Sequence, residues 1–454
     1  IGREIKVSIL AFTIIFLAVC GCYASYAKYH SALHPIFLYN ALWLIVTIVL
    51  QINTMEWYPL ENEVYAVLLV GLISFDFGGL LIGYGTINKS SIYVNTYIEE
   101  YEDDEIDYRK VGNRLLMIQL VLTLISIPLF LRGLSYVQSY GMSVMRNIIA
   151  NSVEAGYMTA AERILFLHLG VFPAMQTCSF IQVFLWAKGK IKGWNLIASI
   201  IDLVIVVVST VGRWEVFYFA LAMLCAYMLN KHPSDSGMSI GKQKKIRRRI
   251  RVIIAIAIIA LVGVTIQRHK VVGNIFESIL NIVAGYFCCG PALLQVMLKN
   301  PVSSGISTWH WGQAIFGGLL GCINYILQIV TFKRVYLNLY DTQAYAAEFY
   351  AVGAHQSMNA YPTWYYYFMQ DFGYLGVVLI TAIIAGISVR IYRKAKREPS
   401  INNQLAYFYV LHVILFASVW WELRRSDIVA TMLHNLWIMP LIGLKVRGKK
   451  NGKV

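Results

Sequence analysis

The chain contains the run HQSMNAYPTWYYYFMQD at positions 355–371, and an apolar run of membrane-spanning length follows it directly. This run closes a longer segment, which begins with Gln267-Arg268-His269-Lys270 immediately after another apolar run. Ten aromatic residues lie between positions 340 and 368. Trp and Tyr gather where a membrane protein meets the water interface. We therefore expect membrane spans arranged around one large loop, residues 267–371.

The composition predicts an all-α polytopic membrane protein. Hydrophobic residues make up 58% of the 454 residues and charged residues only 14%, with a mean hydropathy of +0.59, whereas soluble domains carry about 25% charged residues. Long apolar runs without polar alternation favour helices over a β-barrel. A single membrane domain, 1–454, is expected, with about eleven spans at 5–24, 36–52, 64–85, 113–132, 163–187, 194–210, 213–230, 252–266, 372–390, 404–421 and 428–444.

Basic residues indicate which loops face the cytoplasm. The formal net charge is +15, yet 21 of the 39 Lys and Arg residues lie in four short segments, 188–192, 231–251, 390–397 and 445–454. Basic loops stay on the cytoplasmic side of a membrane. The charge therefore indicates membrane orientation rather than nucleic-acid binding, and 231–251 is predicted to be a basic cytoplasmic loop.

The alternation of sides then places the large loop, 267–371, outside the cytoplasm. The short turns at 210–213 and 423–427 fall on the same side. Two parts of the large loop, 275–298 and 312–330, are apolar enough to enter the membrane as interfacial or re-entrant helices. If both cross it, the count rises to thirteen spans and the sidedness of the other loops does not change.

No metal or cofactor site is predicted. The seven cysteines lie in or beside apolar runs without metal-ligand spacing, which favours small apolar side chains in a helix bundle. The acidic run at 99–107 has consecutive rather than converging carboxylates, so we expect a solvated cytoplasmic loop. No cleavable signal peptide is expected, because the first apolar run is interpreted as the first span, and Ile1 indicates a trimmed start.

Arginines at the outer ends of spans are the sharpest functional candidates. Arg213 follows Gly212 in a turn with almost no loop, and Arg268 begins the large loop. Arg424 and Arg425 occupy a second short outer turn, against the positive-inside pattern. Guanidinium groups bind phosphates through paired hydrogen bonds. These positions predict a site for a lipid-linked diphosphate at the outer membrane surface.

The same arginines have structural alternatives. An arginine such as Arg213 at the end of a span commonly extends to lipid phosphate. Either Arg424 or Arg425 is also placed to form a local ion pair with Glu422 or Asp427. The sequence leaves these interpretations open.

A base for sugar chemistry is expected in the large loop. His355 in its neutral form would accept a proton from a sugar hydroxyl. Glu348 and Asp371 are alternative bases, and a hydrogen-bonded surface histidine is the structural alternative for His355. Asp76 in the third span is either a functional carboxylate or a residue that pairs helices.

The last residues of the loop are candidate sugar-binding groups. Asn359, Tyr361 and Thr363 offer hydrogen bonds to sugar hydroxyls, and Trp364 and Tyr366 offer aromatic faces for stacking. The default explanation for aromatics at a membrane boundary is an interfacial belt. The extension of this aromatic run back to position 340 favours some sugar stacking.

Several motifs carry a resemblance to a known family. They are HPIFLYNALW at 34–43, Gly212-Arg213 at a tight outer turn, YFCCGPA at 286–292, NAYPTWYYYFMQDFGYLG at 359–376, and the arginines that follow the penultimate span. In these features and in its layout the chain resembles the Wzy-type O-antigen and capsule repeat-unit polymerases, which are related to the O-antigen ligases.

The resemblance implies a GT-C-like membrane glycosyltransferase in the bacterial inner (plasma) membrane, with its active site facing the periplasm or exterior. The donor would be a glycan on undecaprenyl diphosphate and the acceptor a lipid-linked repeat unit. Arg213 and Arg268 would hold the diphosphates with one of Arg424 and Arg425, and His355 would be the base. No cofactor is implied, and a chain-length regulator protein is a further implied partner.

Three alternative functions remain open. An O-antigen ligase would pass the finished glycan to a different acceptor, and His355-Gln356 followed by Gly373-x-x-Gly376 resembles a ligase motif. A lipid-linked oligosaccharide flippase would use the same lipids without catalysis, but no internal repeat of spans is evident. A histidine deep among the spans and entry of acyl-CoA from the cytoplasm would favour a membrane acyltransferase, whereas His355 is predicted outside.

Overall fold

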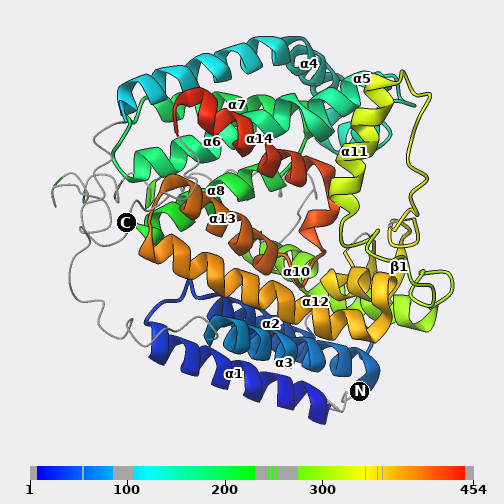
Figure 1. Ribbon diagram of the computed structural model, residues 1–454. Coiled ribbons are helices and arrows are strands. Elements are labelled where there is room, and N and C mark those ends of the chain that lie inside the picture. The colour runs from blue at the N-terminus through cyan, green and yellow to red at the C-terminus, as the bar shows by residue number, and fades with distance from the viewer. Residues whose placement is uncertain are drawn as a thin grey trace.

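The computed structural model describes residues 8–53, 56–84, 106–230, 275–342, 344–354, 356–359 and 361–444, with single positions between 241 and 255. Most of this part is helical (Figure 1). The α-helices are α1 (Ile9–Tyr29), α2 (Pro35–Ile52), α3 (Asn62–Tyr84), α4 (Tyr108–Ala150), α5 (Ala160–Arg163), α6 (Val171–Ala187), α7 (Asn195–Thr210), α8 (Trp214–Leu229), α10 (Ile275–Lys299), α11 (Gly317–Val330), α12 (Thr363–Arg397), α13 (Ile401–Leu415) and α14 (Ser426–Ile442). The π-helix η2 (Ile164–Leu169), the 3-10 helix η4 (Glu422–Arg424) and an antiparallel hairpin of β1 (Tyr350–Gly353) and β2 (Gln356–Met358) complete the elements.

The long helices run side by side in layers (Figure 1). One layer holds α1, α2, α3 and α12, the opposite layer holds α4, α6, α7 and α14, and α8, α10 and α13 lie between them. The most extensive contacts join α12 to α3, α1 to α2, and α4 to α7. A large buried core links the first layer to the middle helices, and a smaller one lies among α4, α6 and α7.

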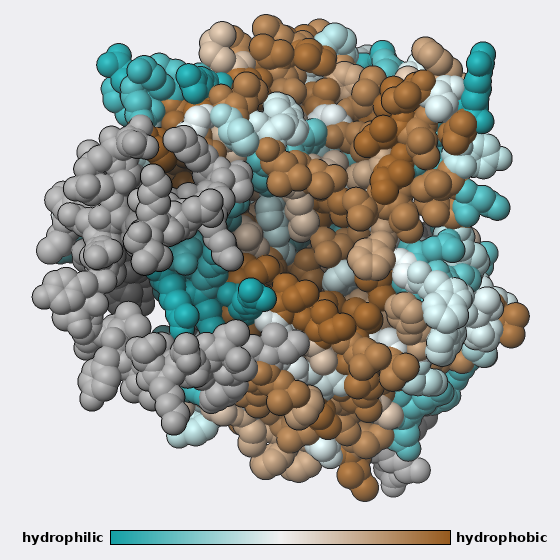
Figure 2. Space-filling model, viewed as in Figure 1, coloured by the Kyte–Doolittle hydropathy of each residue, from teal (hydrophilic) through white to brown (hydrophobic). Residues whose placement is uncertain are grey.

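The structure is that of a membrane-embedded, all-α protein. Among the described residues, six helices are long and apolar enough to cross a membrane, and α7, α8, α11 and α14 are shorter apolar helices. Figure 2 shows hydrophobic side chains in a broad belt across the visible face, with hydrophilic side chains toward its two sides. The expected number of eleven spans stays a prediction. The span at 252–266 and most of the basic loop 231–251 lie outside the described residues.

Helix α1 illustrates why these sequences belong in lipid. It buries the small or branched residues Ala11, Ile14 and Ala18 against its neighbours. Its opposite face exposes large apolar side chains at helical spacing, namely Ile9, Phe12, Phe16, Val19 and Tyr23. In water such a stripe would be unfavourable, whereas hydrocarbon solvates it at no cost.

Glycine sets the close approach of α3 and α12. A Cβ atom at Gly78 would lie 2.2 Å from the backbone oxygen of Ala382 in α12. Only a residue without a side chain fits between the two backbones, which is the arrangement that small residues permit in membrane helix pairs. The α3–α12 pair in turn fixes the position of the aromatic residues at the start of α12.

Polar side chains inside the bundle bind one another across helices. Asn40 Nδ2 donates to Asp76 Oδ1 over 2.7 Å, which joins α2 to α3. Asp202 of α7 accepts from Gln119 Nε2 and from Thr123 Oγ1 of α4, each over 2.8 Å. Such pairs are the expected state of polar groups in a membrane interior. Of the two interpretations of Asp76, the geometry shows helix pairing.

The large loop, 267–371, contains much regular structure. Helices α10 and α11 occupy its two apolar parts, and α10 packs against α2 and α12. Helix α12 begins at Thr363, earlier than the expected span, and its first part ends at a kink where Phe372 and Gly373 leave helical geometry. The positive φ of 58° at Gly373 suits glycine, which has no Cβ penalty there. The kink therefore lies where the sequence predicted the membrane boundary.

The two ends of the bundle gather different loops. At one end, the α2–α3 connection pairs with the hairpin, since Tyr58 N donates to Val352 O over 2.9 Å. At the other end, Lys188 donates to the carbonyl of Pro399, and the Lys190 ammonium lies 4.6 Å from the Tyr108 ring centroid. Loops that the charge pattern assigned to one side of the membrane thus lie together.

Candidate functional site

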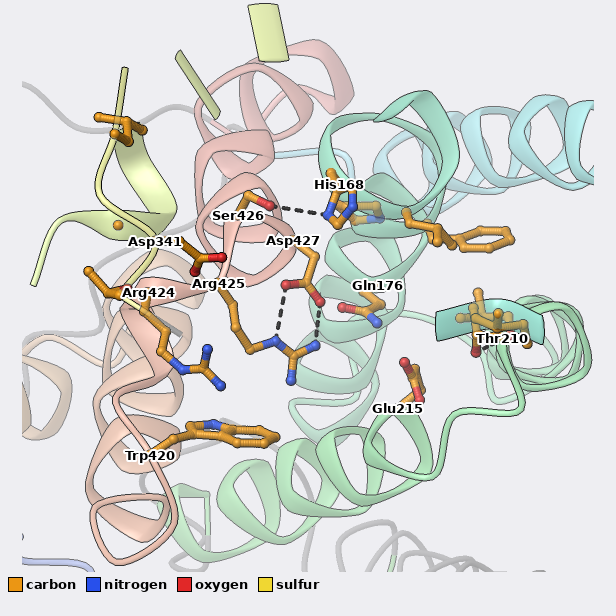
Figure 3. Close-up of a pocket in the computed structure, with 18 of the residues that line it drawn as sticks. His168, Gln176, Thr210, Glu215, Asp341, Trp420, Arg424, Arg425, Ser426 and Asp427 are labelled. Atoms are coloured by element: carbon orange, nitrogen blue, oxygen red, sulfur yellow. Dashed lines mark hydrogen bonds and ion pairs between the residues drawn. The ribbon is translucent and has the colours of Figure 1, made fainter. Parts of the chain in front are cut away.

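A cavity of about 520 Å³ lies at the hairpin end of the bundle (Figure 3). Its walls come from segments far apart in the sequence: η2 and the start of α6, the end of α7 and the start of α8, the start of α11, residues 339–342, and the turn at 420–427. The α7–α8 turn, the start of α11, residues 339–342 and the turn at 420–427 were all predicted to lie outside the cytoplasm. The volume falls within the range of about 300–1,000 Å³ that is usual for ligand sites.

Arg425 is held firmly in the cavity wall. Its guanidinium forms a two-point ion pair with the Asp427 carboxylate, and its Nη1 donates to the Tyr218 hydroxyl over 2.9 Å. Below it, the buried Glu422 carboxylate lies 3.4 Å from His412 Nε2. Burial acts to raise the pKa of Glu422, but His412 and Arg425 outweigh it and hold the pKa below its usual value. The local-pair interpretation therefore holds for Arg425.

Arg424 has a different environment. Its guanidinium carbon lies 5.1 Å from the Tyr367 ring centroid and 5.2 Å from that of Trp420. Its Nε is buried and has no hydrogen-bond partner among the described residues. A buried, unsatisfied donor on a charged group is costly, and an anion in the cavity would supply the missing acceptor.

Arg213 approaches the same region from the α7–α8 turn without lining the cavity. It donates a hydrogen bond to the Tyr286 hydroxyl, and its guanidinium carbon lies 5.0 Å from that ring centroid. Tyr286 contacts Tyr361 at 5.7 Å between ring centroids, and Tyr361 contacts Trp420 at 5.0 Å. A continuous row of aromatic rings thus connects Arg213 with the two arginines of the cavity. Arg213, Arg424, Arg425, Tyr286, Tyr361 and Trp420 are called the arginine–aromatic cluster below.

Tyr361 lies at the centre of this cluster. Burial raises the pKa of its phenol, while the positive charges of Arg146 and Arg213 act in the opposite direction. Arg146, on the outer part of α4, is therefore a further basic residue close to the cluster.

Glu215 and His168 line the cavity but were not among the predicted site residues. Glu215 lies in the first turn of α8, two positions after Arg213, and its Oε2 has no hydrogen-bond partner among the described residues. His168 lies in η2, where its Nδ1 is 3.2 Å from Ser426 Oγ and its ring stacks on Tyr325 at 4.8 Å. A charged residue inside a tight apolar turn was a visible signal for Glu215. No feature of the sequence indicated the π-helix η2, which places His168 in the cavity wall.

The other predicted sugar-binding residues lie apart from the cavity. Asn359 Nδ2 donates to the backbone oxygen of Ala347 over 2.8 Å. Thr363, Trp364 and Tyr366 are fully buried in the first part of α12. Since these three side chains pack inside the protein rather than at its surface, they do not form an interfacial belt, and they do not line the cavity.

Of the predicted bases, Asp371 and Glu348 are described by the structure, whereas His355 lies outside the described residues. The predicted arginine Arg268 also lies outside them. Asp371 accepts backbone hydrogen bonds from Ala314 over 3.1 Å and from Ile315 over 2.7 Å, so both of its oxygens fix the loop before α11. Glu348 accepts from the Tyr350 hydroxyl over 3.1 Å.

The comparisons with known proteins assign no family. The chain matches no family model, no curated protein and no solved structure. In the part of the chain that the structure describes, no group of three or more His, Cys, Asp or Glu side chains is placed to hold a metal ion. The geometry of the cavity is therefore the basis of the function proposed below.

Proposed function

We propose that the protein is a membrane glycosyltransferase that polymerises oligosaccharide repeat units carried on undecaprenyl diphosphate, at the outer face of the bacterial inner membrane. The observation that carries this proposal is the buried, unpaired Nε of Arg424 in a cavity at the end of a membrane-embedded helix bundle. A lipid-linked anion at the membrane surface would supply the hydrogen-bond acceptor that this nitrogen lacks.

The charge arrangement favours a diphosphate over a single carboxylate. Arg424 and Arg425 point into one cavity (Figure 3), and Arg213 lies at the far end of the aromatic row. Arg425 is already neutralised by Asp427, so Arg424 is the side chain whose charge needs a partner. A diphosphate has enough oxygens to bind Arg424 and to reach neighbouring donors.

The aromatic faces favour a sugar beside the diphosphate. The guanidinium carbons of Arg424 and Arg425 lie 5.2 and 5.4 Å from the Trp420 ring, and Tyr361 packs at a tilt against this ring. Rigid rings next to a charge offer an apolar surface and a fixed shape. The cavity of about 520 Å³ accommodates a diphosphate with part of its glycan, while the polyprenyl chain remains in the bilayer.

The chemistry that these groups support is displacement of a lipid diphosphate. The acceptor hydroxyl would attack the anomeric carbon of the donor glycan, and undecaprenyl diphosphate would leave with the bonding electrons. The arginines would stabilise the negative charge that develops on the leaving group. Fixed charges in a site largely shielded from water act strongly on such a transition state.

The test uses purified full-length protein with lipid-linked repeat units extracted from cells that produce it. We expect a ladder of products with increasing numbers of repeats. Arg424→Ala should lower the polymerisation rate by about 10²–10³-fold, the usual effect of removing one transition-state charge partner. Arg334→Ala is the matched control, because Arg334 is exposed in the loop after α11.

Three results would contradict the proposal. The protein would not be a polymerase if the wild type yields no ladder while binding the lipids. Arg424 would not be its anion-binding residue if Arg424→Ala and Arg334→Ala polymerise equally fast. Transport of intact lipid-linked units across vesicle membranes without elongation would indicate a flippase.

A further inference from the structure

We propose that the Glu215 carboxylate is the general base that removes the proton from the acceptor sugar hydroxyl. This inference rests on the proposed function, since it needs an acceptor hydroxyl and a leaving diphosphate in the same cavity. Glu215 lies on the cavity wall in the first turn of α8 and faces Arg425 (Figure 3).

The environment of the carboxylate indicates a missing hydrogen-bond donor. Glu215 Oε2 is buried and has no donor among the described residues. Leaving a buried acceptor unsatisfied costs about 1–3 kcal/mol, and more for a charged group. An O–H group of a ligand bound in the cavity would satisfy this oxygen, and an acceptor sugar supplies such a group.

Gly212 provides the space that the carboxylate occupies. A Cβ atom at position 212 would lie 2.1 Å from Glu215 Oε2. The absence of a side chain in this turn therefore lets the carboxylate lie against the backbone. Any larger residue would displace the carboxylate, because the end of a flexible side chain moves more easily than the turn.

Neighbouring carboxylates are less suited to the role. Asp427 is bound at two points by Arg425, and Asp341 is exposed at the rim of the cavity. Glu422 accepts from Tyr218 and contacts His412 rather than lining the cavity. Glu215 is thus the carboxylate that combines a place on the wall with an unsatisfied buried oxygen.

Electrostatics support proton transfer to this position. Burial makes a carboxylate a stronger proton acceptor, because its neutral product needs less solvation. The positive charge of Arg425 attracts the ionised carboxylate before the proton moves. After the transfer, Arg425 retains its ion pair with Asp427, so no charge is left unpaired.

The proposed step moves one proton and replaces one bond at the anomeric carbon. The proton of the acceptor hydroxyl moves to a Glu215 oxygen, and the acceptor oxygen forms a bond to the anomeric carbon. The bond from that carbon to the diphosphate oxygen breaks, and its electron pair leaves with undecaprenyl diphosphate. The carboxyl group then loses its proton to water through the open cavity.

The experiment compares three variants in the polymerisation assay with extracted lipid-linked repeat units. Glu215→Gln keeps the shape but cannot accept the proton, so kcat should fall by about 10²–10⁴-fold, with an unchanged KM and unchanged binding of the donor lipid. Glu215→Asp should retain part of the activity. Gly212→Ala keeps Glu215 but displaces its carboxylate, so kcat should fall to an intermediate value. If Glu215→Gln fails to fold, Gly212→Ala still tests the position of the carboxylate.

The outcomes separate this inference from the proposed function. If the wild type polymerises and Glu215→Gln and Gly212→Ala do so at the same rate, Glu215 is not the base, and the polymerase function still stands. Equal loss of donor-lipid binding and kcat in Glu215→Gln would also overturn the inference, since it would make Glu215 a binding residue. If the wild type forms no polymer, the proposed function fails and the inference fails with it.

Discussion

Arg424 and Arg425 are adjacent in the sequence, yet they have different partners. Arg425 is bound by Asp427 and Tyr218, whereas the Arg424 guanidinium lies against the rings of Tyr367 and Trp420 and its Nε has no hydrogen-bond partner among the described residues. A cation–π contact contributes about 0.5–2 kcal/mol, less than the penalty for keeping a guanidinium away from water and anions. Arg424 thus has the stronger physical reason to bind a ligand.

At the scale of single residues, we predict that Arg213 is required for polymerisation. Arg213→Ala removes a positive charge from one end of the arginine–aromatic cluster, so long glycan chains should be lost while single-repeat glycans remain. The polymerisation rate should fall by about 10²–10³-fold, because one stabilising charge is removed. Gel separation of glycans from cells that depend on this protein measures the result.

Tyr286→Phe is the matched control for Arg213. It keeps the ring under the guanidinium but removes the hydroxyl that accepts its hydrogen bond. If Arg213 only fixes α10, both variants should shorten the glycans equally. Chains of normal length in Arg213→Ala would instead show that this arginine is a lipid anchor.

The sequence singled out three arginines of the arginine–aromatic cluster but not Glu215. Arg424 and Arg425 were visible because adjacent arginines in an outer turn run against the positive-inside pattern, and Arg213 because it follows Gly212 in a turn with almost no loop. Glu215 was visible as a charged residue in an apolar turn, but the place of its carboxylate against Gly212 becomes evident only in the folded turn. His168 depends on η2, a helix type that local sequence does not specify.

At the scale of elements, the α3–α12 pair positions one side of the site. Helix α12 carries Tyr365 and Tyr367, and its first part precedes the kink at Gly373. Tyr365 forms a hydrogen bond with Tyr39 of α2, and Tyr367 lies under Arg424. A change in the distance between α3 and α12 should therefore reach the cavity.

Gly78→Ala tests this dependence. The added methyl group would meet the Ala382 backbone at 2.2 Å, and neither backbone can move without separating the helices. We expect a loss of about 1–3 kcal/mol in stability, the usual cost of overpacking. Thermal unfolding of the purified protein in detergent measures it as a lower Tm.

Gly79→Ala is the neighbouring control. Its methyl group would lie 3.1 Å from the end of the Ile36 side chain, which rotates more easily than a backbone. Equal Tm values for the two variants would show that the close contact of Gly78 does not limit the packing of α3 against α12.

The observed helix boundaries agree with the expected spans for several helices but not for the start of α12. The apolar pattern located α1, α2, α3, α7 and α8 to within a few residues of the expected spans. It placed the start of α12 nine residues late, at 372 instead of 363, because the polar and aromatic run before it resembled a loop. Tertiary burial rather than hydropathy makes this run helical, since residues 363–371 are buried on all sides.

At the scale of the whole molecule, the cavity lies at the end of the bundle that the charge pattern predicts to face away from the cytoplasm. The turn at 210–215, residues 339–342 and the turn at 420–427 line one cavity, although long spans separate them in the sequence. Lys188 and Pro399 meet at the other end. The structure shows that each set of loops shares an end, and the basic residues predict which end faces the cytoplasm.

Cysteine labelling in intact cells tests that orientation. Arg334→Cys lies in the exposed segment after α11 and should react with a membrane-impermeant maleimide added from outside. Lys192→Cys lies between α6 and α7 and should react only after the membrane is permeabilised. The seven native cysteines lie in helices of the bundle and most are buried, so the unmodified chain provides the background. The reverse pattern would place the arginine–aromatic cluster in the cytoplasm, where lipid-linked glycans are assembled rather than polymerised, and would contradict the proposed function through topology alone.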